Sequence, residues 1–585
     1  MGGSSRTTGG WRRRRAVAAC AAAVAAVGGF LTFGAADRAH ATIVDVDEAA
    51  DVCAAAANPC LIAEPVTVKS GATLDFGLRE VRIVTGGHME IGAGVVEILC
   101  GSFTAATPGV TAVLARGPVA TGGQDGGSLS IEARGRCASG EGGCFVDDDC
   151  AAGTCTKGGG VSLIGGIEGQ GLVAGSLSIR TAGDILLADV IDLDSTDADG
   201  DGGQLDVTST LGAVVVGGRV EATAGRFGFG GIVSILAAGD VSVGGMVDAS
   251  GGDFDGGELD VEAGGDLTVA GRLRVDSTAG EGGGGFVALT AAGDLRLNAT
   301  AIVSADGHQS LDNFGGDGGT FLLSAGGDLS VSPGASLIAA GARPDGAGGT
   351  LDASSEGTTT LAGEVSLIAK GTRGIGGSLA IRACEIEIAA TGALTNSGEG
   401  GDNVLTGLRA IAARPGASVT ADAATGTNTI RYRDESSPPL LQATFVPPPV
   451  LQVIPELPRC ADESTTTTTT GSATTTTTVS SGTCGDGSLD SGEDCDDGDS
   501  QFARGEACGP TCRWVECADP DASGAVNASD ALGLLRVAVG LESCEPCVCN
   551  VDSSAGPIGA SDALRTLSVA VGLPVELLCA PCAAP

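Results

Sequence analysis

The sequence is poor in aromatic and basic residues. Trp, Tyr and Phe together make up only 3% of the 585 residues, and residues 42–460 contain no Trp and a single Tyr, Tyr432. Lys and Arg number 32 against 72 Asp and Glu, so the formal net charge is −40. Nucleic-acid binding needs Lys and Arg to neutralise phosphates, and this balance argues against it. The acidic excess favours solubility and mutual repulsion, with weak, distributed cation binding as the alternative.

Histidine is also scarce, and this limits the catalytic chemistry. Beyond residue 42 only His88 and His308 remain, far apart in the sequence, and there is no His-based triad, HExxH motif or phosphate loop. Polysaccharide lyases and hydrolases need paired carboxylates and usually aromatic stacking, for which only scattered Phe are present. We therefore assign no catalytic residue and lean against an enzyme, although carboxylates alone leave hydrolysis open.

Glycine and small aliphatic residues are abundant, with 99 Gly and 43% hydrophobic residues. Glycine pairs followed by alternating aliphatics recur about every 28 residues, at 202–203, 230–231, 256–257, 284–285, 318–319, 348–349 and 376–377. In the unit GGELDVEAGGDLTVAGRLRVDSTAG (256–280), three aliphatic pairs alternate with polar residues: Leu259 and Val261, Leu267 and Val269, Leu273 and Val275. The unit predicts three short strands that bury their apolar row only when stacked on copies of themselves. We predict a mainly β protein, with a long parallel β-helix over residues 61–435.

The GG-x-L-x-I-x-A and GD-L-x-V cadence resembles the β-helical shafts of filamentous-haemagglutinin-like surface proteins, over roughly residues 61–430. A β-sandwich or propeller array is disfavoured because paired hairpin turns and aromatic anchors are lacking. The Asp of the GD motif recurs at Asp184, Asp240, Asp266, Asp294 and Asp328. These carboxylates form a ladder at one corner, for which turn chemistry is favoured over catalysis.

The N-terminus has the pattern of a signal peptide over residues 1–41. A basic segment (12–15) precedes an apolar one (16–36), and Ala39-His40-Ala41 fits a cleavage site. We expect a secreted or cell-surface protein, with an uncleaved anchor as the alternative. Residues 42–60 indicate a short helix that caps the open end of the β-helix.

Twenty cysteines suit an oxidising compartment. Most fall in even clusters, which favours local disulfides, including Cys53 with Cys60 and a stapled loop insertion at 137–155. The Asp147–Asp149 run in that loop is interpreted as solvated rather than as a cation site. Cys100, Cys384 and Cys460 stand apart, and we expect at least one to be a buried free thiol.

Residues 436–483 form a Pro- and Thr-rich linker. Part of its proline-rich, apolar stretch (438–458) can pack along the shaft, whereas the Thr-rich stretch (464–483) cannot make a core. The segment CGDGSLDSGEDCDDGDSQFARGEACGPTC (484–512) resembles the myxococcal-type cysteine-rich repeat of exported bacterial proteins. The match departs after Asp499, where the chain has GEAC. The resemblance implies a small disulfide-held module.

The last segment, 513–585, contains a calcium-loop pattern in DPDASGAVNASD. Ligand positions 1, 3, 5, 7, 9 and 12 are filled by Asp519, Asp521, Ser523, Ala525 (through its carbonyl), Asn527 and Asp530, with Gly524 at the turn. Val526 is expected to bridge two such loops through a core. A helix with an apolar face of Leu532, Leu535, Val537 and Val539 follows.

The pattern returns 32 residues later, less perfectly. Candidate ligands there are Asn550, Asp552, Ser554 and Asp562, the last displaced by one residue. Paired loop–helix units of this kind resemble type I dockerin modules with EF-hand-type calcium loops. The resemblance implies calcium as cofactor and a cohesin-like partner, whose contacts would fall on Ala528, Ser529, Ala560 and Ser561.

Two alternatives accompany this C-terminal prediction. Each loop can be a metal-free turn before a helix, more readily the second than the first. The pairs Cys544-x2-Cys547 and Cys579-x2-Cys582 have zinc-ligand spacing, but in an exported, cysteine-rich chain disulfides are favoured.

The leading hypothesis is an exported, modular, structural or adhesive β-helix protein that attaches through a calcium-binding tail to a cohesin-like protein or a cell-surface component. An extracellular glycan is a further candidate partner. The alternative is a dockerin-bearing polysaccharide hydrolase or lyase of β-helix fold, an analogy from module order.

Overall fold

The computed structural model describes most of residues 43–460 and parts of the C-terminal region. The described residues are 43–115, 125–138, 142–150, 154–172, 174–309, 314–371, 373–422, 424–434, 438–460, 495, 508, 515, 517–520, 526, 528–538, 543–551, 558–570, 575 and 577–579. The expected signal peptide, the Thr-rich linker and almost all of the cysteine-rich repeat lie outside them. The chain divides into two units, 1–465 and 466–585, which are described separately below.

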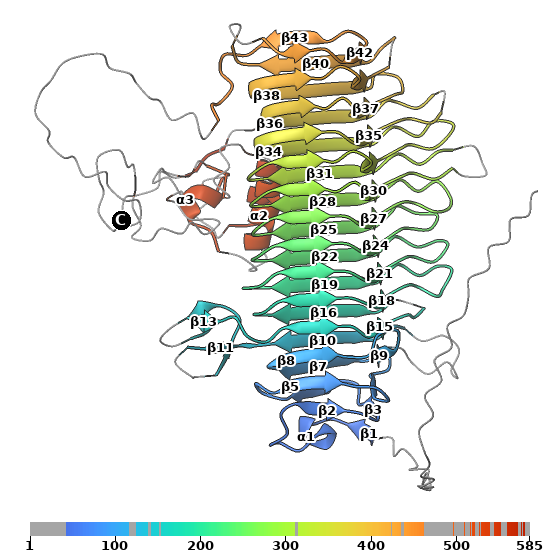
Figure 1. Ribbon diagram of the computed structural model, residues 1–585, viewed down its shortest axis with the longest axis vertical. Coiled ribbons are helices and arrows are strands. Elements are labelled where there is room, and N and C mark those ends of the chain that lie inside the picture. Colours follow the sequence, from blue (N-terminus) through green and yellow to red (C-terminus); the bar gives the residue numbers. More distant parts are fainter. Residues whose placement is uncertain are drawn as a thin grey trace, which may run out of the picture. The chain divides into compact units, whose positions relative to one another are not determined.

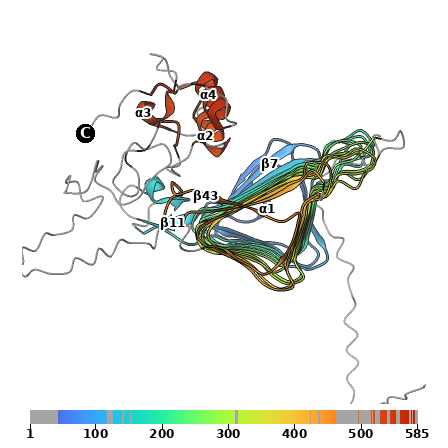
Figure 2. The same cartoon turned by 90° about the horizontal axis from the view of Figure 1, so that it is seen from above.

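The first unit is a β-solenoid of about 12 turns, in which successive coils stack through parallel strands (Figure 1). Seen along its axis, each coil is roughly triangular (Figure 2). One coil consists of β25 (Glu258–Ala263), β26 (Leu267–Val269) and β27 (Arg272–Arg274), and each strand pairs in parallel with its equivalents in neighbouring coils. The prediction of a parallel β-helix with three strands per coil is confirmed.

The strands lie on three faces. The first face contains β4 (Thr73–Asp75), β7 (Val95–Cys100), β10 (Ser128–Ala133), β16 (Ser176–Thr181), β19 (Gln204–Ser209), β22 (Ile232–Ala237), β25, β28 (Phe286–Ala291), β31 (Thr320–Ala325), β34 (Thr350–Leu361), β36 (Ser378–Ile388), β38 (Asp402–Ala413), β40 (Thr427–Tyr432) and β43 (Val450–Val453). The second contains β2 (Cys60–Ile62), β5 (Glu80–Ile83), β8 (Ser102–Ala105), β14 (Val161–Leu163), β17 (Ile185–Leu187), β20 (Val214–Val216), β23 (Val241–Val243), β26, β29 (Leu295–Leu297), β32 (Leu329–Val331) and β41 (Leu440–Leu441), together with the second halves of β34, β36 and β38. The third contains β1 (Ile43–Val46), β3 (Pro65–Val68), β6 (His88–Glu90), β9 (Thr111–Leu114), β15 (Gly166–Glu168), β18 (Val190–Asp192), β21 (Arg219–Glu221), β24 (Met246–Asp248), β27, β30 (Ile302–Ser304), β33 (Ser336–Ile338), β35 (Glu364–Ser366), β37 (Ala393–Thr395), β39 (Ser418–Thr420) and β42 (Thr444–Val446).

The core is a continuous column of small aliphatic side chains. All six aliphatics of the 256–280 unit are buried, and the cluster that contains them runs from Val46 to Ile430. Alternate residues along each strand point inward because the side-chain period of a strand is two. Stacking aligns equivalent residues, so Leu259 lies between Val233 and Val287 on neighbouring strands.

The glycine pairs mark a corner at which neighbouring backbones nearly touch. A Cβ on Gly257 would lie 2.0 Å from the carbonyl oxygen of Gly231, and one on Gly285 equally close to that of Gly257. Neither Gly257 nor Gly285 has a positive φ. Glycine is needed at a corner when φ is positive or when two backbones approach closely. At these positions the close approach is the reason.

The N-terminal end of the described solenoid carries a single helical turn, α1 (Ala49–Val52), and a disulfide between Cys53 and Cys60. The strand β1 precedes this turn and already pairs with β3, so the first rung lies within residues 42–60. Cys384 and Cys460, which stand apart in the sequence, form a disulfide with each other. Cys100 is the buried free thiol that we expected, and burial raises its pKa to about 12.

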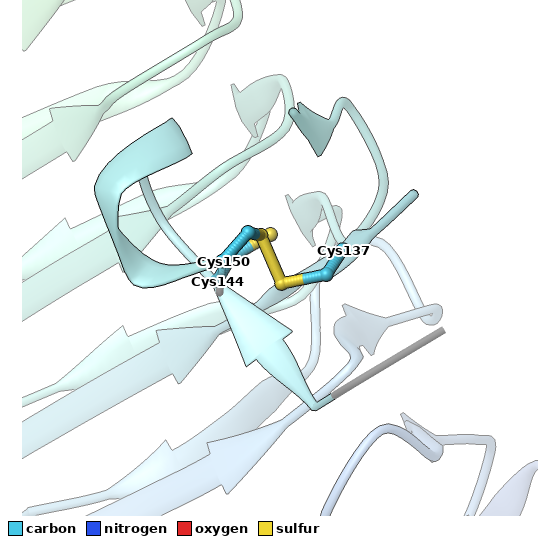
Figure 3. Close-up of side chains that lie close together, drawn as sticks. All are labelled: Cys137, Cys144 and Cys150. Atoms are coloured by element: carbon cyan, nitrogen blue, oxygen red, sulfur yellow. A yellow bond between two sulfur atoms is a disulfide. The ribbon is translucent and has the colours of Figure 1, made fainter. Parts of the chain in front are cut away.

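The insertion at 137–155 is stapled by two disulfides. One joins Cys137 to Cys150 (Figure 3), and the other joins Cys144 to Cys155. It holds β11 (Gly135–Cys137), β12 (Gly143–Cys144), β13 (Cys155–Thr156) and a 3-10 turn, η2 (Asp147–Asp149). Oδ2 of Asp149 accepts the N–H groups of Phe145 and Val146, which lowers the pKa of this carboxyl. The described acidic side chains of this loop thus order its backbone.

The second unit contains three helices, α2 (Ala528–Ala538), α3 (Pro546–Cys549) and α4 (Ala560–Ala570), and α2 packs against α4. Its described disulfides include Cys517–Cys579, Cys544–Cys549 and Cys495–Cys508. Over the part of the chain that the structure describes, no helix combines the length and apolarity needed to cross a membrane.

Candidate functional site

The C-terminal unit buries the two carboxylates that were predicted at the ends of the first calcium loop. Asp519 is 1% exposed and Asp530 is 0% exposed. Asp530 is the third residue of α2, so its carboxylate belongs to the first helical turn. Burying a carboxylate is strongly unfavourable unless it is paired or binds a metal. The intervening candidates Asp521, Ser523, Ala525 and Asn527 lie outside the described residues.

The second loop repeats this placement. Asn550 and Asp562, its first and last candidate ligands, are both buried, and Asp562 is the third residue of α4. The carboxylate of Asp562 accepts the N–H groups of Val551 (3.0 Å) and Gly559 (2.9 Å). These bonds satisfy part of the acceptor capacity of this carboxylate. Asp552 and Ser554 lie outside the described residues.

A shared core joins the two loop–helix units. Val526 and Ile558 each precede the last candidate ligand of their loop by four residues, and both pack against one cluster that includes Leu534, Val548 and Ala563. The N–H of Ala518, next to Asp519, donates to the carbonyl of Val548 (2.8 Å). The two units are thus similar in structure as well as in sequence, including the bridging position expected for Val526.

The donor set fits a hard cation such as calcium. Carboxylate and amide oxygens suit Ca²⁺, whereas structural zinc prefers thiolate and imidazole. The described cysteines with zinc-like spacing are in disulfides, since Cys544 pairs with Cys549 and Cys579 with Cys517, and Cys547 is also oxidised. The thiols needed for zinc are therefore not available at these positions.

The predicted apolar face of the first helix is wrong in its residues. Leu532 and Leu535 of α2 are exposed, and Ala531 and Leu534 are buried instead. Asp530 is buried on the same side of the helix as Leu534, one turn later. The equivalent residues of α4 behave alike, with Leu564 and Leu567 exposed. The two helices therefore present four leucines to solvent at repeated positions.

On the shaft, the aspartates of the GD motif bond between coils. Oδ1 of each accepts a backbone N–H of the next coil: Asp184 from Ala213, Asp240 from Asp266, Asp266 from Asp294, Asp294 from Asp328, and Asp328 from Thr358, all at 2.7–2.9 Å. Arg296 additionally bridges Asp266 and Asp294, and its hydrogen bond lowers the pKa of Asp266. The carboxylates bond backbone, but the N–H groups that they accept belong to the neighbouring coil and not, as expected, to their own turn.

A second acidic group lies on the third face and was missed from the sequence. Asp192, Asp194 and Glu221 offer oxygens that all lie within 4.8 Å of one another. Burial, and then the charge of Asp194, hold the pKa of both Asp192 and Glu221 above their usual values. Arg219 pairs with Glu221, and Gln170 donates to Asp192. The signal available in the sequence was the recurrence of acidic residues about one coil apart.

Exposed phenylalanines gather on loops of neighbouring coils, which the sequence analysis treated as scattered. The rings of Phe229 and Phe254 stack at 4.7 Å between centroids with 14° between their planes. Phe227 lies next to them in the chain and is also exposed. Their positions relative to the glycine pairs differ from coil to coil, so a simple repeat count does not align them.

No protein-family model, curated protein or solved structure matches the chain. The sites above therefore rest on their own geometry and chemistry.

Proposed function

We propose that this protein is an exported, modular β-helix protein that attaches through a calcium-binding, dockerin-like tail. The β-helix acts as an extended structural or adhesive shaft, and residues 484–512 form a cysteine-rich spacer module of the myxococcal type. The many disulfides support an oxidising, extracellular location. The tail attaches the protein to its partner and thereby presents the shaft.

The observation that carries this proposal is the burial of Asp519 and Asp530, at 1% and 0% exposure. Two carboxylates at the first and last positions of a twelve-residue loop are the anionic ends of an EF-hand-type site. A cation bound by both carboxylates would compensate part of the free energy of their desolvation. The second loop, with an amide at Asn550 and hydrogen bonds on Asp562, binds calcium more weakly.

The exposed leucines of α2 and α4 are the proposed attachment surface. Leu532 and Leu564 each follow the last loop ligand by two residues, and Leu535 and Leu567 follow it by five. Exposed apolar side chains that recur on both halves of a small module favour a protein partner. Ala560 and Ser561 at the start of α4 are exposed as well, in keeping with contacts to a cohesin-like protein.

The test is calcium titration of the full chain, followed by differential scanning calorimetry. Calcium should raise the melting temperature of the tail transition, and a chelator should reverse the shift. The double variant Asp519→Asn, Asp530→Asn keeps side-chain shape but removes both charges, so it should abolish the shift. Glu545→Gln, an exposed acidic residue of the same unit, is the matched control and should retain it. A shift that persists in the double variant contradicts the ligand assignment.

A second candidate function, polysaccharide hydrolysis, is favoured by one observation. Asp192, Asp194 and Glu221 cluster beside Arg219 with oxygens that all lie within 4.8 Å of one another, and glycosidases act through paired carboxylates. The raised pKa of Glu221 suits a general acid. Release of reducing sugar from polygalacturonate or a β-glucan, lost in Asp194→Asn, would support this candidate. Activity that is unchanged in that variant would exclude this cluster as its source.

A further inference from the structure

Three long loops join the third face to the first here, and the exposed phenylalanines lie on the first two of them. The loops are residues 222–231, 249–257 and 275–285, each from a successive coil. Such loops project together from one corner of the coil (Figure 2). Phe227, Phe229 and Phe254 are 40%, 50% and 47% exposed. Three large rings held in solvent within two adjacent loops are an unusual feature in a chain with 3% aromatic residues.

The loops hold these rings in fixed positions because they continue the ladder of the coils. The N–H of Asp253 donates to the carbonyl of Arg226 (2.5 Å), and that of Gly252 to Gly228 (2.9 Å). One coil further on, the N–H of Ala279 donates to Gly252 (3.1 Å). The phenylalanine platform is thus preorganised, and little conformational entropy is lost when a ligand binds to it.

Carboxylates border the platform. A hollow of about 450 Å³ is lined by Phe227, Phe254, Asp253, Asp255 and Glu281, together with backbone of the 275–285 loop. Asp255 uses Oδ1 to accept the N–H of Gly283, which leaves its other oxygen for a ligand. Within the described part of the chain, the side chains of Asp253 and Glu281 make no hydrogen bond or ion pair. The hollow therefore combines aromatic rings with hydrogen-bond acceptors.

The surface continues onto the first face. A second hollow of about 440 Å³ is lined by Ile232, Asp255, Glu258 and Phe286, among others, and shares Asp255 with the first. The two hollows together cross several coils, which are about 4.8 Å apart. This spacing is close to the length of one sugar residue in an extended chain, so successive coils can meet successive sugars.

We propose that this surface, the Phe227/Phe229/Phe254 platform with its carboxylate rim, binds a neutral polysaccharide. The apolar face of a sugar ring packs on an aromatic ring, and its hydroxyls donate to carboxylates. The lining side chains that can ionise are all acidic, and one cation, Arg226, lies over the ring of Phe227 at 5.0 Å from its centroid. The acidic excess around the two hollows disfavours a uronic-acid polymer or an anionic membrane. The proposal adds a ligand class to the adhesive shaft, and it requires neither calcium in the tail nor the Asp192 cluster.

The experiment is affinity electrophoresis of the full chain in native gels that contain a soluble polysaccharide. Mixed-linkage β-glucan, xyloglucan and galactomannan are the neutral probes, and polygalacturonate and alginate the acidic ones. At least one neutral probe should retard the protein. The variant Phe229→Ala, Phe254→Ala should weaken that interaction at least tenfold, and Glu281→Gln, which keeps all the rings, severalfold. Phe314→Ala removes an exposed ring from a loop outside the hollow and should bind like the unaltered protein.

Three outcomes would overturn the proposal: retardation by none of the neutral probes, equal retardation of the double variant, or stronger retardation by the acidic probes. All substituted rings are exposed, so far-UV circular dichroism and melting temperature should stay unchanged, which separates lost binding from lost fold. Gels run with a chelator test independence from the tail. Retardation should persist there even if calcium binding by the tail is disproved.

Discussion

The two units of this chain reach stability by different means. In the solenoid the same inter-coil interactions recur in coil after coil. They are a column of buried aliphatics, backbone hydrogen bonds and carboxylates that each accept an N–H from the next coil. The C-terminal unit has only a small core, is cross-linked by several disulfides and buries four oxygen-bearing candidate ligands of the proposed calcium sites.

The difference follows from size and from repetition. A small module buries too little apolar surface to offset its chain entropy, so disulfides or metals are needed. A solenoid adds nearest-neighbour interfaces with each coil and needs no such support in its interior. Removal of disulfides or calcium should therefore destabilise the C-terminal unit and leave the stability of the solenoid unchanged. Substitutions in the repeated core should destabilise the solenoid alone.

The largest expected effect is loss of the tail when its long-range disulfide is removed. Cys517 and Cys579 are 62 residues apart in the chain, and such a cross-link contributes about 2–5 kcal/mol. The variant Cys517→Ser, Cys579→Ser should lose the tail transition in calorimetry and keep the shaft transition. Cys137→Ser, Cys150→Ser, which opens the projecting loop, is the control and should leave both. A shaft transition that falls with the tail would contradict this division.

The core of the shaft could be predicted from the sequence because it depends on period alone. Leu259, Val261 and their partners alternate with polar residues in one short segment. This alternation alone identifies the side chains that point inward, without knowledge of how the coils stack. The first loop of the tail was likewise visible, since the spacing from Asp519 to Asp530 is local.

Features that depend on residues far apart could not be predicted. The coils differ in length, so the N–H that each GD aspartate meets lies 26–34 residues away. The same irregularity hides the Phe229–Phe254 stack and the pairing of Cys384 with Cys460. The exposure of Leu532 and Leu535 on α2 could not be predicted, because which side of a short amphipathic helix is buried depends on how it packs against α4.

The next largest effect is a cavity in the shaft core. Leu323 in β31 is 1% exposed and its neighbour Leu322 is 37% exposed, which gives a matched pair in one strand. Leu323→Ala should cost about 2–5 kcal/mol and open the shaft locally, because each coil contacts only its neighbours. Limited proteolysis should cut near this coil, and the tail transition should not move. Leu322→Ala should resemble the unaltered protein, and equal effects in both variants would contradict the assigned strand register.

A smaller effect is expected from breaking one rung of the carboxylate ladder. Oδ1 of Asp266 accepts the N–H of Asp294 (2.9 Å) and Oδ2 accepts from Arg296 (2.6 Å). The Asp266 side chain is 44% exposed, so solvent screens the ion pair, and Asp266→Ala should cost below about 1 kcal/mol. Thermal melts of the shaft transition would measure it. Glu262→Ala, an exposed acidic residue of the same coil, is the control, and a loss as large as that of Asp266→Ala would show that the ladder bond adds nothing.

The smallest expected effect is a stabilisation of the shaft by a substitution on the third face, whereas the substitutions above destabilise it. Burial, and then the charge of Asp194, raise the pKa of Asp192 in the folded protein, so the ionised form is disfavoured above the unfolded pKa of about 3.9. Asp192→Asn keeps an acceptor for Gln170 but removes the charge, and it should raise the shaft melting temperature slightly at pH 7 and not near pH 4. Asp266→Asn should have the opposite sign, because Arg296 lowers the pKa of Asp266 and its ionised form stabilises the fold. This variant should lower the melting temperature at pH 7 and still at pH 4, and the difference should disappear only below the unfolded pKa of about 3.9. Melts of both variants across this pH range would check the signs, and a stabilisation by Asp192→Asn that persists at pH 4 would rule out charge as its cause.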